Sequence, residues 1–283
     1  MLPLLVQLEK VSLLTFLVSS MLAMGLTLTV QAVVAPLCDA RLVIRALLLN
    51  FAFAPAFAWL LTVVIPLQRG HAIGLLLLGG VAGAPFLPKV VESARGNAAL
   101  AAALMSLLTF GTILFLPFAL PLMIPGLQAN PWTIARPLIL FIVLPFVAGM
   151  GMKRAWATVA GRAAPVLARI GSASLLLLVV LLLALNVRVL LGVIGSGAIL
   201  ATLLFFVGLF WGGWLLGGTG AQERGALGLA TTARNFGAAL APASTSFDDP
   251  QVVVMIIVGA IVCILVSFLA ARWVRRGTIS NPG

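Results

Sequence analysis

Long apolar runs separated by short polar connections make up this chain. Each run has about the length that a helix needs to cross a hydrocarbon core of about 30 Å, which takes roughly 20 residues. Strand-length alternation is absent, and a helix satisfies its own backbone in lipid. The pattern therefore predicts an all-α integral membrane protein with nine transmembrane helices. The nine runs cover about Val11–Gln31, Leu42–Ile65, His71–Val91, Ala98–Ile124, Ile134–Met152, Pro165–Val187, Val189–Leu216, Gly225–Ser244 and Val252–Val274.

The composition supports this class. Hydrophobic residues make up 63% of the chain and charged residues 8%, against roughly 45–50% and about 25% in soluble domains. The net charge of +11 would suggest a nucleic-acid partner in a soluble chain, but the cations lie mostly between apolar runs, where they set topology and meet lipid headgroups. We expect membrane lipids as partners and no nucleic acid. The short connections predict a single transmembrane unit over residues 1–283.

The positions of the cations predict the orientation. With the N-terminus outside, eleven cations fall on the inner side and four on the outer side, and cytoplasmic loops are the ones enriched in Lys and Arg. We therefore expect a plasma (inner) membrane protein with a cytoplasmic C-terminus. The inner cations are Arg41, Arg45, Arg95, Lys153, Arg154, Arg162, Arg169, Arg224, Arg272, Arg275 and Arg276, and the outer ones are Lys10, Arg69, Arg136 and Arg188.

The third and eighth runs differ from the others. The third contains GGVAGAPFLPKVVESARGN, with Pro85 and Pro88 inside the apolar stretch, and a proline removes a backbone donor and disturbs the preceding turn. The eighth contains TTARNFGAALAPAS, which is small and polar and carries Arg234. Two interrupted spans at corresponding places in two halves are typical of an inverted-repeat transporter with two crossing broken helices.

Arg234 is the strongest candidate for a functional side chain. It lies about ten residues from either end of its run, and an arginine at that depth costs from about 3 to more than 10 kcal/mol unless it has a partner or faces a cavity. One interpretation is a substrate or ion site that includes the adjacent Asn235. The other is a structural arginine that binds carbonyls released by a broken neighbouring helix.

Further candidates are less specific. Lys89 either faces the substrate or pairs with Glu92, which lies three residues on and would share its helix face. Glu92 could also carry a proton for coupling. Asn50, Thr231 and Thr232 are uncharged polar residues within runs, which either bind substrate or hydrogen-bond across helices.

An enzyme is not expected. The chain has a single histidine, His71, and no tyrosine, so no nucleophile and base can be assembled. With two distant cysteines it also lacks the ligands of a structural metal site, and no cofactor is expected. A channel is the weaker alternative, because charges beside helix breaks suit a midplane binding site. The leading hypothesis is a secondary transporter, with a non-transporting membrane receptor or scaffold as the alternative. The sequence indicates no protein partner.

Several stretches together resemble the bile acid:sodium symporter family. They are SSMLAMGLTL at Ser19–Leu28, LLNFAFAPAFAWLL at Leu48–Leu61, the ESARGN that ends the third run, and ATTARNFGAAL at Ala230–Leu240. The resemblance implies a panel domain (about 11–31 and 134–187), a core domain (about 42–124 and 189–274), and two broken helices that cross in the core. It also implies an organic anion as substrate, moved by alternating access.

The chain departs from the family pattern at the sodium-binding motifs. Arg234 falls where the motif E-x-G-x-Q-N has its glutamine, while Asn235 keeps the asparagine. The resemblance therefore implies transport that is not coupled to sodium, with a sodium-coupled symporter whose ion site is rebuilt as the alternative. The other matched ligand positions have no side-chain oxygen and are Leu87 and Pro88 (or Pro88 and Lys89 with the alignment shifted by one), Ala101, Met105 and Ala230.

Overall fold

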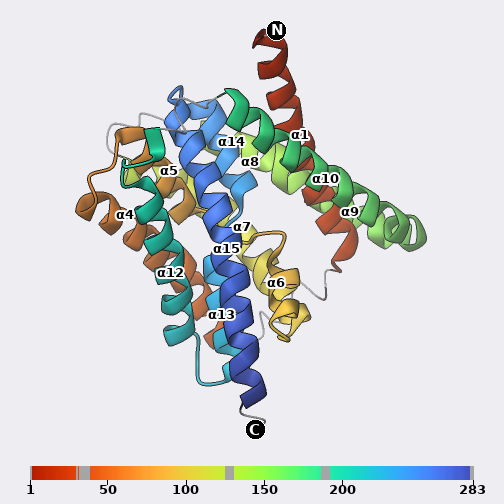
Figure 1. Ribbon diagram of the computed structural model, residues 1–283. Coiled ribbons are helices and arrows are strands. Elements are labelled where there is room, and N and C mark those ends of the chain that lie inside the picture. Colours follow the sequence, from red (N-terminus) through yellow and green to blue (C-terminus); the bar gives the residue numbers. More distant parts are fainter. Residues whose placement is uncertain (1, 30, 32–38, 125–130, 186–191, 281–283) are drawn as a thin grey trace.

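Every regular element of the chain is a helix within the described residues, 2–29, 31, 39–124, 131–185 and 192–280 of the computed structural model (Figure 1). Seven helices in this part are long and apolar enough to cross a membrane. They cover Leu4–Thr27, Ala40–Val64, Ala98–Met123, Ile134–Ala155, Ala157–Leu181, Ala198–Leu216 and Pro250–Arg276. The protein is thus an all-helical, multi-pass membrane protein, as the apolar runs predict.

Five of the long helices are continuous: α1 (Leu2–Thr27), α7 (Ala98–Met123), α10 (Ala157–Leu185), α12 (Ala198–Leu216) and α15 (Pro250–Ser280). The other two each contain a π-helical turn. They are α3 (Ala40–Leu48), η2 (Leu49–Phe53) and α4 (Ala54–Val64), and α8 (Pro131–Leu138), η3 (Ile139–Val143) and α9 (Leu144–Ala155). Pro55 and Pro145 each follow one of the two π turns. In an α-helix a proline ring clashes with the carbonyl four residues earlier, and here that carbonyl lies in the wider π turn, which makes room for the ring.

Two further segments are interrupted in their middle, as predicted for the third and eighth runs. The first consists of α5 (Arg69–Gly80) and α6 (Leu87–Ser93), and the second of α13 (Ala221–Thr232) and α14 (Phe236–Ser246). The first break precedes Pro88, which lies in the opening turn of α6, where the missing N–H has no helical partner to lose. The expectation that no smooth helix runs through Pro85 and Pro88 is therefore confirmed, with Pro85 inside the break and Pro88 just after it.

Some predicted helix ends are also wrong. The run expected from Val189 begins as helix α12 only at Ala198, because Gly195 and Gly197 adopt φ of 86° and 77°, which end a right-handed helix. Helix α10 begins at Ala157 and includes Pro165, where the run was expected to begin. The predicted ends Val187 and Val189 and the cation Arg188 lie outside the described residues.

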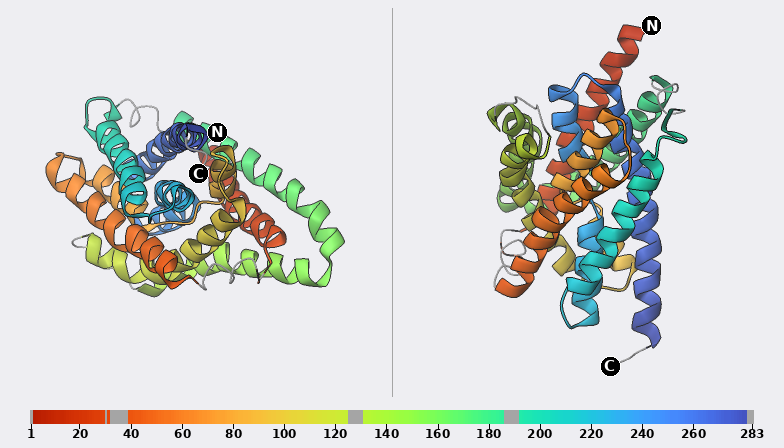
Figure 2. Two further views of the ribbon diagram at one scale, coloured as in Figure 1. Left: turned by 90° about the horizontal axis from the view of Figure 1, so that it is seen from below. Right: turned by 90° about the vertical axis from the view of Figure 1, so that its left-hand side faces the viewer.

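Helices α1, α9 and α10 pack against one another on one side of the molecule (Figure 2, left). Glycines allow this close approach: the Cα of Gly25 on α1 faces the backbone of Phe146 and Gly149 on α9, with no room for a Cβ. A Cβ at Gly171 on α10 would likewise meet the hydroxyl of Ser20 on α1. These three helices form one compact layer.

The remaining helices surround the two interrupted segments. Helix α5 packs between α4 and α15, α13 packs on α12 and α15, and α6 packs on α7. The two groups meet where α8, which continues through η3 into α9, lies against α7 and α14, and where Leu17 of α1 lies against Gly237 of α14. The start of α1 and the end of α15 lie at opposite ends of the molecule (Figure 1).

Candidate functional site

Helix α7 supports the break of the first interrupted segment. Ala82 donates its backbone N–H to Thr112 Oγ1 at 2.8 Å, and Thr109 Oγ1 donates to the carbonyl of Gly83 at 2.9 Å. Gly83 has a φ of +79°, and a Cβ at this position would clash with Thr109. Two hydroxyls of α7 therefore take the place of backbone partners that the break removes.

Asn235 organises the break of the second segment. Its Oδ1 accepts a hydrogen bond from the backbone N–H of Ala238 at 3.1 Å, so Asn235 is the N-cap of α14. Its Nδ2 donates to the carbonyl of Gly83 at 3.4 Å. The residue chosen from the sequence for its place beside Arg234 therefore contacts both breaks.

The fully buried Arg234 side chain bridges the two interrupted segments. Its Nη1 donates to the carbonyl of Val81 at 2.7 Å, and its Nη2 donates to the carbonyl of Thr231 at 2.5 Å. Val81 is the C-cap of α5 and Thr231 lies in the last turn of α13. Both carbonyls thus belong to the negative end of a helix dipole, where a cation is stabilised.

Carbonyls at a helix break are the partners expected if Arg234 is a structural arginine, which was one of its two interpretations. The Arg234 Cζ also lies 6.0 Å from the centroid of the Phe205 ring. Nε, by contrast, is buried and has no hydrogen-bond partner in the described part of the chain. A buried donor left unpaired costs about 1–3 kcal/mol, so Nε is the nitrogen of Arg234 that still favours an acceptor.

Thr231, Thr232 and Asn50 are buried and bond within their own helices. The two threonine hydroxyls donate to the carbonyls of Leu227 and Gly228, one turn earlier, at 2.7 and 2.8 Å. Asn50 lies in η2, and its Nδ2 donates to a carbonyl of α3 at 2.9 Å. Its Oδ1 is buried with no partner among the described residues. Asn50 therefore contributes an unused acceptor, as Arg234 contributes an unused donor.

Lys89 and Glu92 lie apart from the buried candidates. Both side chains are exposed on α6, whereas Arg234, Asn235 and Asn50 are buried. The described residues show no ion pair between Lys89 and Glu92, although the spacing of three residues allowed one. Lys89 and Glu92 are thus accessible from outside the helix packing, and neither neutralises the other.

Several residues at the breaks were not singled out from the sequence. Phe86 and Phe236 flank the two breaks, and their rings stack with centroids 6.3 Å apart. Cys263 on α15 donates from Sγ to the carbonyl of Thr232 at 3.3 Å. Thr109 and Thr112 could have been identified from the sequence, because polar residues three apart share a face on an otherwise apolar helix.

The positions that the resemblance aligned with the family's sodium ligands are packed into the core. Leu87, Ala101, Met105 and Ala230 are buried and Pro88 is half-buried, and none of their side chains has an oxygen. In the part of the chain that the structure describes, no three His, Cys, Asp or Glu side chains group together to hold a metal ion. The site therefore consists of backbone carbonyls, two threonine hydroxyls, an amide and a fixed guanidinium.

Membrane-length helices around two interrupted segments, which meet at a buried charge, are features of membrane transporters. The chain belongs to the sodium bile acid symporter family, whose family model matches residues 14–193. The resemblance drawn from the sequence motifs is thereby confirmed. Members of this family are transporters rather than enzymes, so transport across a membrane is the role that membership supports.

The matched residues run from α1 to just before α12, and they include the first interrupted segment. Arg234 and the second interrupted segment lie beyond the match. None of the curated proteins compared with the chain matches it. The role of the second interrupted segment therefore follows from the contacts of Arg234 and not from the family match.

Proposed function

We propose that this protein is a secondary transporter that carries a small organic anion by alternating access and is not driven by sodium. The family membership and the helical architecture support transport. The hydrogen bonds from Arg234 to the carbonyls of Val81 and Thr231 carry the proposal for the ion and for the charge of the substrate.

In the proposed topology, the seven long helices and the two interrupted segments cross the membrane, which makes nine spans. The opposite positions of the start of α1 and the end of α15 support an odd number of crossings (Figure 1). The bias of cations supports a cytoplasmic C-terminus. We assign α1, α8, α9 and α10 to a panel and the other helices to a core that moves against it.

The proposed independence from sodium follows from the charge at the breaks. Sodium is a hard cation and prefers several oxygen ligands. Arg234 already occupies two carbonyls there, and the positions matching the family's ligands offer no side-chain oxygen. A unit charge at about 4 Å from Arg234 would add about 4 kcal/mol of repulsion at an effective dielectric of 20. The tethered guanidinium thus replaces a bound cation and is never released.

The same charge favours an anion as substrate. The guanidinium holds a positive field at the breaks, and a carboxylate or sulfonate is the natural partner for its unused Nε. We assign substrate contact to Arg234 and Asn235, with Asn50, Thr231 and Thr232 as further polar residues of the core. Lys89 is assigned to the same path, because its exposed ammonium on α6 extends the positive field.

Without sodium, the driving force has other sources. Facilitated diffusion and exchange of one anion for another need no coupling ion. Proton coupling through Glu92 is the third form, and its exposed position on α6 leaves the carboxylate within reach of solvent. Uptake driven by a pH gradient distinguishes this form from the other two, since Glu92→Gln should abolish it.

Uptake of organic anions into proteoliposomes tests the proposal. Sodium, potassium and choline are compared as the external cation at fixed voltage and pH, with empty liposomes as the control. Equal uptake in all three is expected. Steep stimulation by sodium alone would mean that carbonyls and hydroxyls rebuild the ion site, and the proposal would then be wrong. No flux of any anion, from protein that still binds one, would favour a receptor on a transporter fold.

A further inference from the structure

Three tryptophans and a phenylalanine cluster at one end of α12 and α15. The ring centroids of Trp214 and Trp273 are 4.9 Å apart, and those of Trp211 and Trp273 are 5.1 Å apart. Phe210 packs edge-on against Trp273 at 5.9 Å. Trp211 and Trp273 remain 42% and 46% exposed, so the cluster is open to its surroundings. Exposed tryptophans at the ends of membrane helices are typical of the headgroup level.

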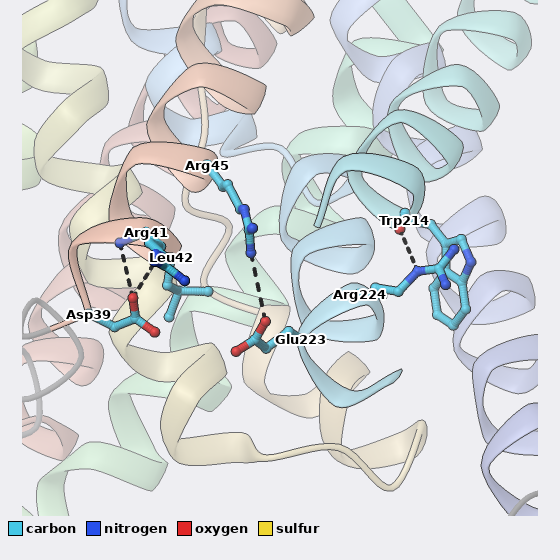
Figure 3. A network of polar contacts seen from close by, with 7 residues as sticks. All are labelled: Asp39, Arg41, Leu42, Arg45, Trp214, Glu223 and Arg224. Carbon is cyan, nitrogen blue, oxygen red and sulfur yellow. Dashed lines mark hydrogen bonds and ion pairs between the residues drawn. The ribbon is translucent and has the colours of Figure 1, made fainter. Parts of the chain in front are cut away.

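Arg224, in the first turn of α13, is held against this cluster. Its Nε donates to the carbonyl of Trp214 at 2.9 Å, and its Cζ lies 4.9 Å from the centroid of a Trp214 ring (Figure 3). The contact joins α13 to the last turn of α12 and stacks the guanidinium on the indole. Arg224 is thereby fixed in one orientation before any ligand binds.

The charge of Arg224 is not neutralised by the acid next to it. Glu223 points away toward Arg45, with the Arg45 Nη1 and Glu223 Oε2 atoms 3.9 Å apart (Figure 3). Within the described residues, Nη1 and Nη2 of Arg224 have no hydrogen-bond partner and no carboxylate. Two parallel N–H donors therefore remain for an anion, in the geometry that a phosphate accepts.

The surface beside the cluster is apolar. On the side toward the middle of the helices, α12 and α15 expose aliphatic and aromatic side chains, and on the other side Arg272 is exposed directly before Trp273. An acyl chain lying along these exposed side chains would bring its headgroup to the tryptophans and the cations. The exposed apolar side chains are Leu203, Leu204, Val207, Ile264, Leu265, Phe268 and Leu269.

We propose that Arg224, Trp214 and Trp273 form a site for the phosphate of an anionic phospholipid, at the inner-leaflet end of α12 and α15. The assignment to the inner leaflet rests on the proposed topology, whereas the site itself does not depend on the transported substrate. The apolar approach favours a lipid over free phosphate, and the unneutralised cations favour an anionic over a zwitterionic headgroup. Because Arg224 lies in the first turn of α13, the lipid would hold the inner half of the second interrupted segment at the membrane surface.

Thermal unfolding of the purified full-length protein with added short-chain lipids tests the site. Dioctanoyl phosphatidylglycerol should raise Tm at lower concentration than dioctanoyl phosphatidylcholine, with about a tenfold difference in apparent affinity. Arg224→Gln should remove this preference, and Arg224→Lys should retain part of it because the charge remains. The matched control is Arg169→Gln, which removes an exposed arginine of α10 and should leave the preference intact.

Trp273→Leu gives a second variant, which keeps Arg224 and its hydrogen bond to the carbonyl of Trp214. It should weaken phosphatidylglycerol binding while leaving Tm without lipid nearly unchanged, because the ring is half-exposed. Equal stabilisation by both lipids, or an unchanged preference in both Arg224→Gln and Trp273→Leu, would overturn the site. Competition by inorganic phosphate at similar concentration would show a free-anion site and would also contradict the proposal.

Discussion

The Nη1 atom of Arg234 lies 2.7 Å from the carbonyl oxygen of Val81, although 153 residues separate the two in the chain. This bond joins the second interrupted segment to the end of α5. With the bond to Thr231, it places one buried positive charge at the C-terminal ends of two half-helices. Both the stability of the core and the proposed exclusion of sodium depend on it.

Arg234→Gln should lower the free energy of unfolding by about 1–3 kcal/mol for each helix-end carbonyl that loses its donor. Arg234→Lys should recover part of this loss, since one ammonium reaches fewer carbonyls than the fork of a guanidinium. Thermal unfolding of the purified variants measures both. If Arg234→Gln unfolds at the same temperature as the unchanged protein, the bridge between the breaks is not a source of stability.

Gly83→Ala should distort the first break. A residue with a Cβ at a φ of +79° costs about 1–3 kcal/mol in backbone strain, and its methyl group would also clash with Thr109. Gly151→Ala on α9 is the matched control, because a Cβ there meets no atom within 4 Å and alanine favours the helix. A lower Tm in Gly83→Ala alone is expected. An equal response of the two variants would count against the strained turn.

Thr112→Val should weaken the hold of α7 on the first break. The substitution keeps the shape of the side chain and removes the acceptor of the Ala82 N–H, which leaves a buried donor unpaired at about 1–3 kcal/mol. Thr62→Val is the control, since its hydroxyl bonds only within its own helix, to the carbonyl of Trp59. Hydrogen exchange of the Ala82 amide should accelerate in Thr112→Val and stay slow in Thr62→Val. Slow exchange in both would show that another group satisfies the amide.

Gly25→Ala should separate α1 from α9. The added methyl group would clash with the carbonyl of Phe146, and overpacking of this kind costs about 1–3 kcal/mol. Gly161→Ala on α10 has open space around its Cβ and should be neutral. Cross-linking of cysteine pairs between α1 and α9 reports the separation. Unchanged cross-linking and Tm in Gly25→Ala would contradict the close packing of the two helices.

The C-terminus should be cytoplasmic. The prediction rests on eleven cations at the inner side against four at the outer side. A fluorescent reporter fused after the last residue should be visible in whole cells and resist protease added outside. An alkaline phosphatase fusion at the same place should be inactive. Activity of the phosphatase fusion would reverse the orientation and move the proposed lipid site to the outer leaflet.

The sequence by itself determined the class of the protein and the places where its helices are unusual. Apolar runs of membrane length can form only helices in lipid, and this argument depends on each run alone. The interruptions in the third and eighth runs also follow from local composition. The same composition singles out Arg234 and Asn235 as candidate site residues. The residues that resemble the family motifs led to the family that the comparison confirms.

Only the tertiary structure decided which groups meet at the breaks. Hydropathy places Arg234 deep within an apolar run, but it cannot show whether a carbonyl of Val81 or a ligand receives the charge. Two prolines predicted the interruption of the third run, but only the structure shows that Pro85 lies in the break while Pro88 lies in the first turn of the following helix. Hydrogen-bond partners far apart in the chain become neighbours only when helices pack. Their identity is therefore a property of the packing and cannot be read from any one segment.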